Sequence, residues 1–175
     1  MELSEALALI RAVPDFPSPG ILFQDITPAL SNPDALAVII QALSAFDSTA
    51  QVVAGIEARG FILGSALALQ RSSGFVPIRK KGKLPAATFS QSYGLEYGED
   101  VIEIHRDAFA SQESVLLIDD VLATGGTLEA SLKLIAEAGG RISSIVVLLE
   151  ILSLGGRARI NAAHADLTIN ALVTL

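Results

Sequence analysis

The sequence predicts an α/β protein whose mostly parallel sheet is covered by helices on both faces. Short apolar runs rich in β-branched residues recur along the 175 residues, and segments with helical periodicity separate them. The runs are continuous rather than alternating, which is typical of strands that are buried on both faces. Strand–helix–strand alternation then favours a parallel sheet. The length suits a single domain over residues 1–175, since domains run to roughly 100–200 residues.

Each regular element has a local signal. Strands are expected at 51–56, 75–78, 115–118 and 145–149, and helices at 34–46, 60–70 and 127–138. Asn32 suits the N-cap of the first helix, and Pro33 suits its first position, where a proline loses no hydrogen bond. Gly139 and Gly140 end the last helix, because glycine at this position stops helical patterns.

Two regions fall outside this pattern. Residues 13–28 contain four prolines in sixteen positions, and they belong to an N-terminal segment, 1–32, that precedes the first expected helix. Residues 80–104 are rich in Gly, Ser and Tyr, a composition that disfavours a buried strand or helix. We expect 80–104 to form a hairpin or a flexible excursion from the sheet.

Composition excludes several classes of protein. The chain is 51% hydrophobic and 18% charged, which excludes intrinsic disorder, and its apolar runs are too short to span a membrane. A net charge of −7 has the wrong sign for a general binder of nucleic acid or anionic membranes. Cysteine is absent, so disulfides, thiolate metal sites and a cysteine nucleophile are excluded. The N-terminus lacks a cationic leader, so we expect a cytoplasmic protein.

The sharpest chemical signal is the stretch VLLIDDVLATGGT at residues 115–127. An apolar strand ends in two aspartates, and a short loop leads into a helix. Ligands of parallel sheets bind beyond the carboxyl ends of the strands, where this loop lies. Gly125 and Gly126 let the backbone approach an anion closely, and the helix N-terminus supplies partial positive charge. Thr124 and Thr127 add hydroxyl groups, so the loop predicts a phosphate site.

Asp119 and Asp120 cannot bind the phosphate themselves, but they suit the hydroxyl groups of a sugar beside it. Adjacent residues of a strand point to opposite faces of the sheet. Two readings therefore stay open. Either the backbone bends at the pair and both carboxylates reach one ribose, or one of the two is structural.

The stretch resembles the phosphoribosyl diphosphate (PRPP) signature of the type I phosphoribosyltransferases, and it lacks the Walker pattern of P-loop NTPases. Four more segments resemble the adenine phosphoribosyltransferase family: PDFPSPGILFQDITP at 14–28, EARG at 57–60, RKKGKLP at 79–85 and LEYG at 95–98. The resemblance implies a type I phosphoribosyltransferase fold with an N-terminal hood over 1–32 and a lid over 80–104. It also implies a homodimer that makes AMP and pyrophosphate from adenine and PRPP, with Mg²⁺ carried on the PRPP diphosphate.

The resemblance assigns roles to individual residues. For PRPP it implies Arg59, Arg79, Lys80, Lys83, Asp119, Asp120, Ala123, Thr124, Gly125, Gly126 and Thr127, with Arg79 reaching the diphosphate of the neighbouring subunit. For adenine it implies Leu22, Phe23, Gln24 and Ile151, although many members carry arginine where Gln24 stands. Glu96 is the implied catalytic residue, which handles the proton of the purine as its N9 attacks C1′ of the ribose.

Other readings of the same residues remain open. Arg59 could pair with a surface carboxylate, the basic run at 79–83 could be a solvated face, and Phe23 could be ordinary core. The acceptor could be another base, such as hypoxanthine, guanine, xanthine or orotate. A regulator that senses PRPP and binds nucleic acid is a second alternative. Such a regulator needs a further DNA-binding domain or a basic face, and the net charge of −7 argues against the latter.

Overall fold

The computed structural model describes residues 1–94 and 99–175, and the chain forms two compact units, Met1–Ala42 and Leu43–Leu175. The first unit holds α1 (Leu3–Leu7), β1 (Arg11–Pro14), β2 (Leu22–Asp25), α2 (Thr27–Ser31) and most of α3 (Pro33–Ser44). Strands β1 and β2 form an antiparallel pair that the proline-rich turn connects. The predicted cap of α3 is confirmed, because Asn32 Oδ1 accepts the amides of Asp34 at 3.1 Å and Ala35 at 3.0 Å.

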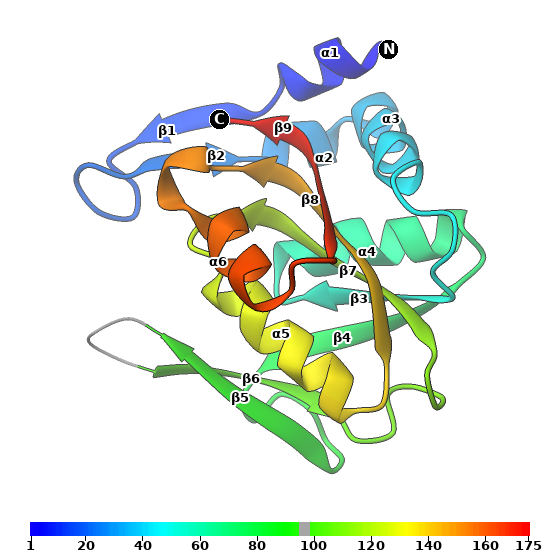
Figure 1. Cartoon of the computed structure of the whole chain (residues 1–175). Coiled ribbons are helices and arrows are strands. Elements are labelled where there is room, and N and C mark those ends of the chain that lie inside the picture. The colour runs from blue at the N-terminus through cyan, green and yellow to red at the C-terminus, as the bar shows by residue number, and fades with distance from the viewer. Residues whose placement is uncertain (95–98) are drawn as a thin grey trace. The chain divides into compact units, whose positions relative to one another are not determined.

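The second unit is built on a seven-stranded sheet (Figure 1). Its strands are β3 (Val52–Ile56), β4 (Gly74–Lys80), β5 (Thr88–Gly94), β6 (Glu99–His105), β7 (Ser114–Leu122), β8 (Arg141–Glu150) and β9 (Thr168–Thr174). The order is β5-β6-β4-β3-β7-β8-β9. Strands β4, β3, β7, β8 and β9 are parallel to one another. The β5–β6 hairpin extends the sheet beside β4 through antiparallel pairs.

These findings confirm the mostly parallel sheet and the four expected strands. The excursion at 80–104 contains the hairpin, and β9 was not predicted. The expected helices are also present: α3, α4 (Arg59–Gln70) and α5 (Gly126–Glu137). A 3₁₀ helix, η1 (Leu152–Leu154), and α6 (Gly156–Ala163) follow β8.

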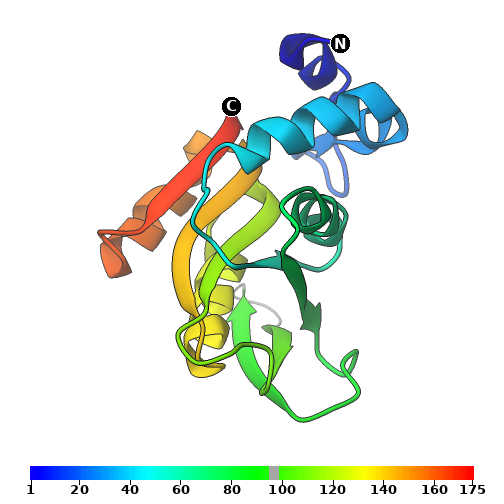
Figure 2. The same cartoon turned by 90° about the vertical axis from the view of Figure 1, so that its right-hand side faces the viewer.

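Helices cover both faces of this sheet. Figure 2 shows α4 on one side of the strands and α5 and α6 on the other. Helix α4 lies close to the sheet because Gly64 has no side chain, and a Cβ there would come within 2.8 Å of Phe75 and 2.9 Å of Ile118. On the other side, Leu134 and Ile135 of α5 belong to the buried core around β7 and β8. Because five of the strands are parallel, their carboxyl ends lie at one edge of the sheet, where the loops can converge.

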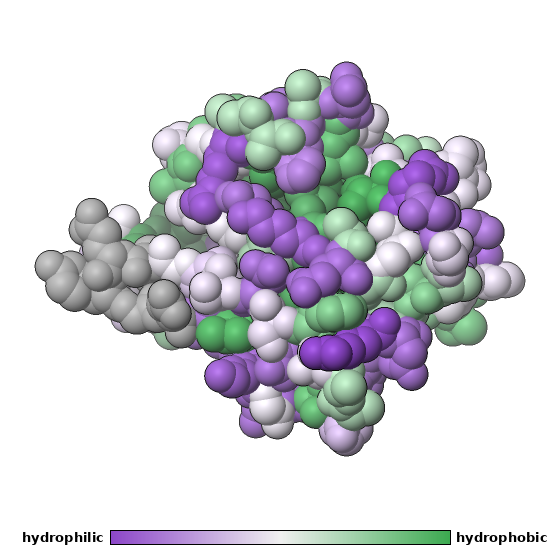
Figure 3. Space-filling model, turned by 60° about the horizontal axis from the view of Figure 1, so that its bottom comes forward, coloured by the Kyte–Doolittle hydropathy of each residue, from purple (hydrophilic) through white to green (hydrophobic). Residues whose placement is uncertain are grey.

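The surface is mixed in character. On the face drawn in Figure 3, hydrophilic residues are interspersed with hydrophobic ones. Within the part of the chain that the structure describes, no helix is long and apolar enough to cross a membrane. The surface of α4 is the clearest apolar exception among the helices of the second unit, since Ile62 is 45% exposed and Leu69 is 82% exposed.

Candidate active site

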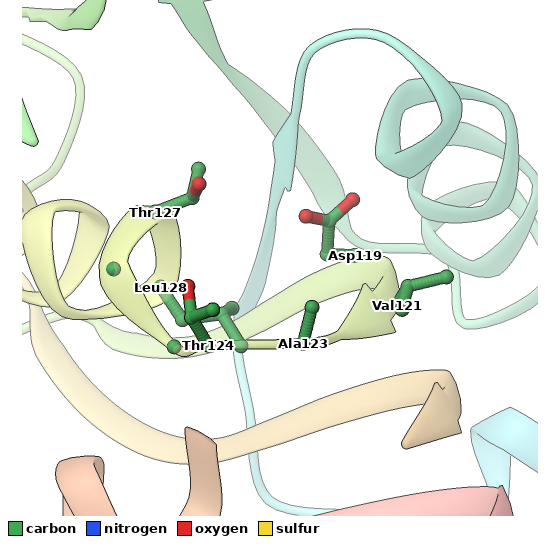
Figure 4. A pocket seen from close by; sticks show the side chains of 8 residues that line it. Asp119, Val121, Ala123, Thr124, Thr127 and Leu128 are labelled. Atoms are coloured by element: carbon green, nitrogen blue, oxygen red, sulfur yellow. The ribbon is translucent and has the colours of Figure 1, made fainter. Parts of the chain in front are cut away.

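A small cavity lies where β7 passes into α5 (Figure 4). Its volume is about 60 Å³, and it is lined by Asp119, Val121, Ala123, Thr124, Gly125, Gly126, Thr127 and Leu128. In Figure 4 the side chains of Asp119 and Thr127 project on the same side of the loop. The structure thus brings together one of the two predicted aspartates and all five predicted residues of the loop.

The backbone of this loop is shaped for an anion. Gly125 has φ +80°, a left-handed conformation that residues with a side chain rarely adopt, and it is the N-cap of α5. The first hydrogen bond from the helix to this cap is donated by the amide of Glu129 to Gly125 O, at 2.9 Å. The amides of the first helical turn have no partner within a helix, and the helix dipole adds partial positive charge. An anionic phosphate group meets both needs.

The two aspartates are neighbours in β7, and both carboxylates lie beside the first residues of α4. The strand continues through both residues to Leu122, and its one irregularity lies earlier, between Val115 and Leu116. Asp119 faces the cavity, whereas the Asp120 carboxylate pairs with Arg59, with 2.9 Å between Oδ2 and Nε. Asp119 lines the cavity and Asp120, paired with Arg59, lies next to it; the contact of both carboxylates with one ribose stays a prediction.

The β3–α4 loop touches the same carboxylates. Arg59 is the first residue of α4, and the peptide bond between Glu57 and Ala58 is cis. A Cβ on Gly60 would lie 3.0 Å from Asp119 Oδ1 and 3.0 Å from the carbonyl oxygen of Ile118. The backbone at Gly60 can approach β7 this closely because it carries no side chain.

Both carboxyl groups are held in an environment that disfavours their charge. Burial, and then repulsion by Asp120, raise the pKa of Asp119 well above its ordinary value. Burial also raises the pKa of Asp120, although the Arg59 guanidinium opposes this effect. Carboxylates that are buried together at the mouth of a loop, and destabilised there, are typical of functional sites.

The basic run after β4 is connected to the β3–α4 loop through Glu57. The Glu57 carboxylate accepts hydrogen bonds from Arg79 Nε at 3.2 Å and from the Lys80 amide at 3.0 Å. Burial opposes the ionisation of Glu57, but these two donors outweigh it and lower the pKa of the carboxyl. Arg79 Nη1 also donates to the carbonyl of Lys83 at 3.1 Å. The predicted diphosphate residues therefore lie in two segments that Glu57 connects: Arg59 at the start of α4, and Arg79, Lys80 and Lys83 at and just after the end of β4.

Comparisons with known proteins identify the family. Residues 29–164 match the model of the phosphoribosyl transferase domain. The adenine phosphoribosyltransferase of Parvibaculum lavamentivorans is 56% identical over 159 residues, which are 90% of this chain and 91% of the relative. The chain belongs to the adenine phosphoribosyltransferase family.

Solved structures of family members have the same fold. The enzyme from Thermoanaerobacter pseudethanolicus superimposes with a TM-score of 0.92 at 43% identity, covering 99% of each chain. The enzyme from Giardia lamblia, solved in complex with 9-deazaadenine, has a TM-score of 0.92 at 39% identity and covers 100% of this chain and 98% of its own. The type I phosphoribosyltransferase fold expected from the motifs is confirmed.

The residues predicted to bind adenine lie in both units. Leu22, Phe23 and Gln24 form most of β2, where the ring of Phe23 makes an edge contact with Phe16, with 5.1 Å between centroids. Ile151 follows β8 directly, and its amide donates to the carbonyl of Leu122 at 2.9 Å. Glu96, the predicted catalytic residue, belongs to 95–98 and lies outside the described residues.

Sequence reasoning missed several residues near the phosphate loop. Tyr93 of β5 lies beside it, 3.9 Å from where a Cβ on Gly126 would be, and burial raises the pKa of its hydroxyl. From α6, the Arg159 guanidinium lies 3.6 Å from the same point. The tyrosine stands in the Gly-rich excursion and the arginine in a polar helix, so neither pattern points to the loop. The loop therefore has neighbours from two other parts of the chain, β5 and α6.

Carboxylates are the natural protein ligands of magnesium at such a site. In residues 1–94 and 99–175, no group of three or more His, Cys, Asp or Glu side chains is arranged to hold a metal ion. Asp119 and Asp120 supply two carboxylates next to the phosphate loop, which suits a hydrated Mg²⁺ that is bound chiefly by substrate oxygens.

Proposed function

We propose that the chain transfers the 5-phosphoribosyl group from PRPP to adenine, giving AMP and pyrophosphate in purine salvage. The observation that carries this proposal is the cavity at the β7–α5 junction, where one carboxylate faces an anion-binding loop. A sugar phosphate needs both features: amides for the phosphate, and acceptors for the sugar hydroxyls. Family membership supplies the acceptor base.

We assign different residues to different parts of PRPP. The loop Ala123, Thr124, Gly125, Gly126 and Thr127 binds the 5′-phosphate, and Asp119 accepts hydrogen bonds from the ribose hydroxyls on the cavity side. Asp120, which lies next to Asp119 and pairs with Arg59, accepts a hydrogen bond from the second ribose hydroxyl. Arg59, Arg79, Lys80 and Lys83 bind the diphosphate, whose negative charge increases as it leaves. Arginine suits this task because its donors match phosphate oxygens in pairs.

The reaction breaks the bond between C1′ and the diphosphate oxygen and forms a bond from C1′ to adenine N9. The proton of the purine ring must leave as the new bond forms, and we assign this step to Glu96 on the strength of the LEYG segment. General acid–base help is worth about 10²- to 10⁴-fold, so most of the acceleration comes from positioning and charge stabilisation. Mg²⁺ on the PRPP diphosphate neutralises part of the charge of the leaving group.

Adenine is read, in this proposal, by the main chain of Leu22, Phe23 and Gln24, with Phe23 stacking on the ring and Ile151 packing against it. Adenine offers an acceptor at N1 beside a donor at N6, and an extended backbone offers the complementary pair. Hypoxanthine and guanine reverse the pattern, so buried polar groups would be left unpaired. Sites built on hydrogen bonds reject such mismatches by as much as about 10⁴- to 10⁵-fold.

The decisive experiment measures pyrophosphate release with PRPP, magnesium and each base in turn. We expect adenine to be used far better than hypoxanthine, guanine, xanthine or orotate. Efficient turnover of one of the other bases would contradict the adenine assignment while keeping the reaction. PRPP binding without turnover of any base would favour the regulator instead. Gln24→Ala should keep the selectivity, whereas Phe23→Ala should weaken the binding of adenine.

We also propose that the enzyme is a homodimer in which Arg79 serves the site of the partner. The apolar face of α4, with Ile62 and Leu69 exposed, supports an interface there. Arg79 is close to this helix, since its guanidinium carbon lies 5.8 Å from the ring centroid of Phe61. Mixing inactive Arg79→Ala chains with inactive Asp119→Ala chains should restore activity, because each hybrid dimer contains one intact site. No recovery, with hybrid dimers verified by mass, would place Arg79 in its own site or outside it.

A cytoplasmic location completes the proposal. PRPP and AMP carry several negative charges, and such groups do not cross the hydrocarbon core of a membrane unaided. The enzyme must therefore work in the compartment where its charged substrate is made and its charged product is used. Measuring the activity in cytosolic and membrane fractions of the source cells tests this directly.

A further inference from the structure

Helix α6 packs on the phosphate loop through its first residue, although it lies about 30 residues after the motif. A Cβ on Gly156 would come within 2.6 Å of Leu122 Cδ1 and 2.9 Å of the Gly125 amide nitrogen, and closer still to the carbonyl oxygen of Ala123. The contact is mutual, because a Cβ on Gly125 would lie 2.9 Å from the carbonyl oxygen of Gly156. Two of the three atoms facing Gly156 are backbone, so they cannot yield by rotation of a side chain.

An ion pair with a buried carboxylate holds α6 in this position. Arg157 Nε donates to both carboxylate oxygens of Glu150, at 2.9 Å and 3.1 Å, and Arg157 Nη2 also donates to this carboxylate. Arg157 Nη1 donates to the carbonyl of Ile169 in β9, at 2.7 Å. Glu150 is 2% exposed at the end of β8. The start of α6 is therefore fixed to the two strands beyond β7 and cannot move away from the loop freely.

We propose that Gly156 is a positioning residue for the 5′-phosphate: α6 supports the phosphate loop from behind, and the absence of a side chain at Gly156 sets the position of the loop. This inference rests on the proposed function, since it assigns a new residue to the same site. A methyl group at this position would push Ala123–Gly125 toward the ligand or push α6 away from it. Either shift moves the amides that face the phosphate, and a misplacement of about 1 Å can cost about 100-fold in such sites.

The test compares two ligands that separate the halves of PRPP. Ribose 5-phosphate contains the 5′-phosphate without the diphosphate, and pyrophosphate represents the diphosphate without the 5′-phosphate. We expect Gly156→Ala to weaken the binding of ribose 5-phosphate by about 10- to 100-fold, measured by calorimetry, and to change that of pyrophosphate by less than about twofold. The KM for PRPP should rise with it, while the KM for adenine stays close to that of the wild type.

Gly140→Ala is the matched control. A Cβ on Gly140 would lie 2.9 Å from Ile135, Phe109 and Val115, so the change also overpacks the core, but at the start of β8. It should lower the melting temperature without the selective loss of ribose 5-phosphate. If Gly156→Ala cannot be purified folded, the double variant Glu150→Gln/Arg157→Met removes the clamp without leaving a buried charge. This double variant should also weaken the binding of ribose 5-phosphate more than that of pyrophosphate, but by a smaller factor than Gly156→Ala does.

The outcomes are distinct. Wild-type affinity for ribose 5-phosphate in Gly156→Ala or in the double variant would overturn the inference. An equal loss of affinity for ribose 5-phosphate and pyrophosphate would also overturn it, as would a selective loss of affinity for ribose 5-phosphate in Gly140→Ala. If the wild-type protein binds neither ribose 5-phosphate nor AMP, the proposed function fails first, and the inference fails with it.

Discussion

Two aspartates at opposite edges of one sheet, the buried Asp47 and the half-buried Asp119, are held in opposite ways. At the amino-terminal edge, Asp47 lies before β3 and is 8% exposed. Its carboxylate accepts hydrogen bonds from the hydroxyls of Ser143 at 2.6 Å and Ser144 at 2.7 Å. It also accepts the amide and hydroxyl of Thr49, at 2.7 Å and 2.8 Å. Burial opposes ionisation, but these donors outweigh it and hold the pKa of Asp47 below its ordinary range.

At the carboxyl-terminal edge, Asp119 has the opposite surroundings. Its carboxylate accepts the Asp120 amide at 2.9 Å, and the Asp120 carboxylate stands next to it. Its pKa is raised, so the protein is folded around a carboxyl group whose charge it does not satisfy. Asp47 therefore stabilises the fold, whereas the raised pKa of Asp119 indicates a cost to the fold, which supports its proposed role in binding the sugar of PRPP. Such trade-offs are common at functional sites.

The largest effect is expected from Asp119→Asn. The amide replaces a charged acceptor, and hydrogen bonds to charged groups are worth about 1.5–3 kcal/mol. The kcat/KM for PRPP should therefore fall by about 10- to 150-fold, measured by steady-state kinetics. The melting temperature should stay equal or rise, because the amide removes the repulsion from Asp120.

Asp107→Asn, an exposed aspartate, is the control for this substitution and should change neither quantity. Asp120→Asn should lose less activity than Asp119→Asn, since Asp120 faces Arg59 rather than the cavity. Unchanged PRPP kinetics in both Asp119→Asn and Asp120→Asn would defeat the assignment of the ribose site.

The aspartate-to-asparagine substitution at the amino-terminal edge should lower stability rather than activity. Asp47→Asn removes a charged acceptor of several hydrogen bonds, so the free energy of unfolding should fall by about 1.5–3 kcal/mol. The activity per folded molecule should stay at the wild-type level, since Asp47 lies at the edge away from the cavity. Urea unfolding and active-site titration measure the two quantities separately. A loss of PRPP affinity without a loss of stability would show that the division between the edges is wrong.

The pH dependence of stability should separate the two aspartates further. Because the pKa of Asp47 is lower in the folded state, its contribution is present above the unfolded pKa of about 3.9 and is lost as the pH falls below it. The difference between wild type and Asp47→Asn should therefore shrink below about pH 4.

The pKa of Asp119 is higher in the folded state, so its ionisation penalises folding at neutral pH and the penalty disappears on acidification. The advantage of Asp119→Asn should fade as the pH drops toward about 4. Unfolding curves between pH 3 and pH 7 test both trends, and parallel curves for all three proteins would contradict them.

The frame of the fold was predictable because it rests on local signals. Continuous apolar runs identified β3, β7 and β8, which are mostly buried, and β4, which is partly buried. The segment TINALVT of β9 has no such continuous run, because Asn170 interrupts its apolar residues at the edge of the sheet. Helix α6 contains two arginines and an asparagine in eight residues, so its pattern does not point to a buried face.

The residues around the cavity were predictable where they are contiguous with a strand. The aspartate pair and the glycine-rich loop directly follow the apolar part of β7, at the edge of the sheet where ligands bind. Gly156 and Arg157 were not predictable, because their importance arises from contacts with Ala123 and Glu150 that only the folded chain creates. A glycine that is required by a neighbour, rather than by its own backbone angle, leaves no mark in a single sequence.

The smallest effect should come from a charge that touches neither aspartate. Arg159 is 53% exposed, and its Nε donates to Glu129 at 2.7 Å, which holds the guanidinium near Gly126 at the carboxyl-terminal edge. Arg159→Ala removes this cation from the surroundings of the loop, while Glu129 keeps its pair with Lys133. The KM for PRPP should therefore rise about two- to fivefold at low salt, as exposed pairs typically allow. Arg141 is also exposed but begins β8 at the amino-terminal edge, which makes Arg141→Ala the matched control.

The effect of Arg159→Ala should vanish near 1 M salt, where the screening length is about 3 Å, and Arg159→Lys should keep most of the wild-type affinity. Equal effects of the two alanine variants would mean that the field of the whole protein, rather than the charge at one edge, attracts PRPP.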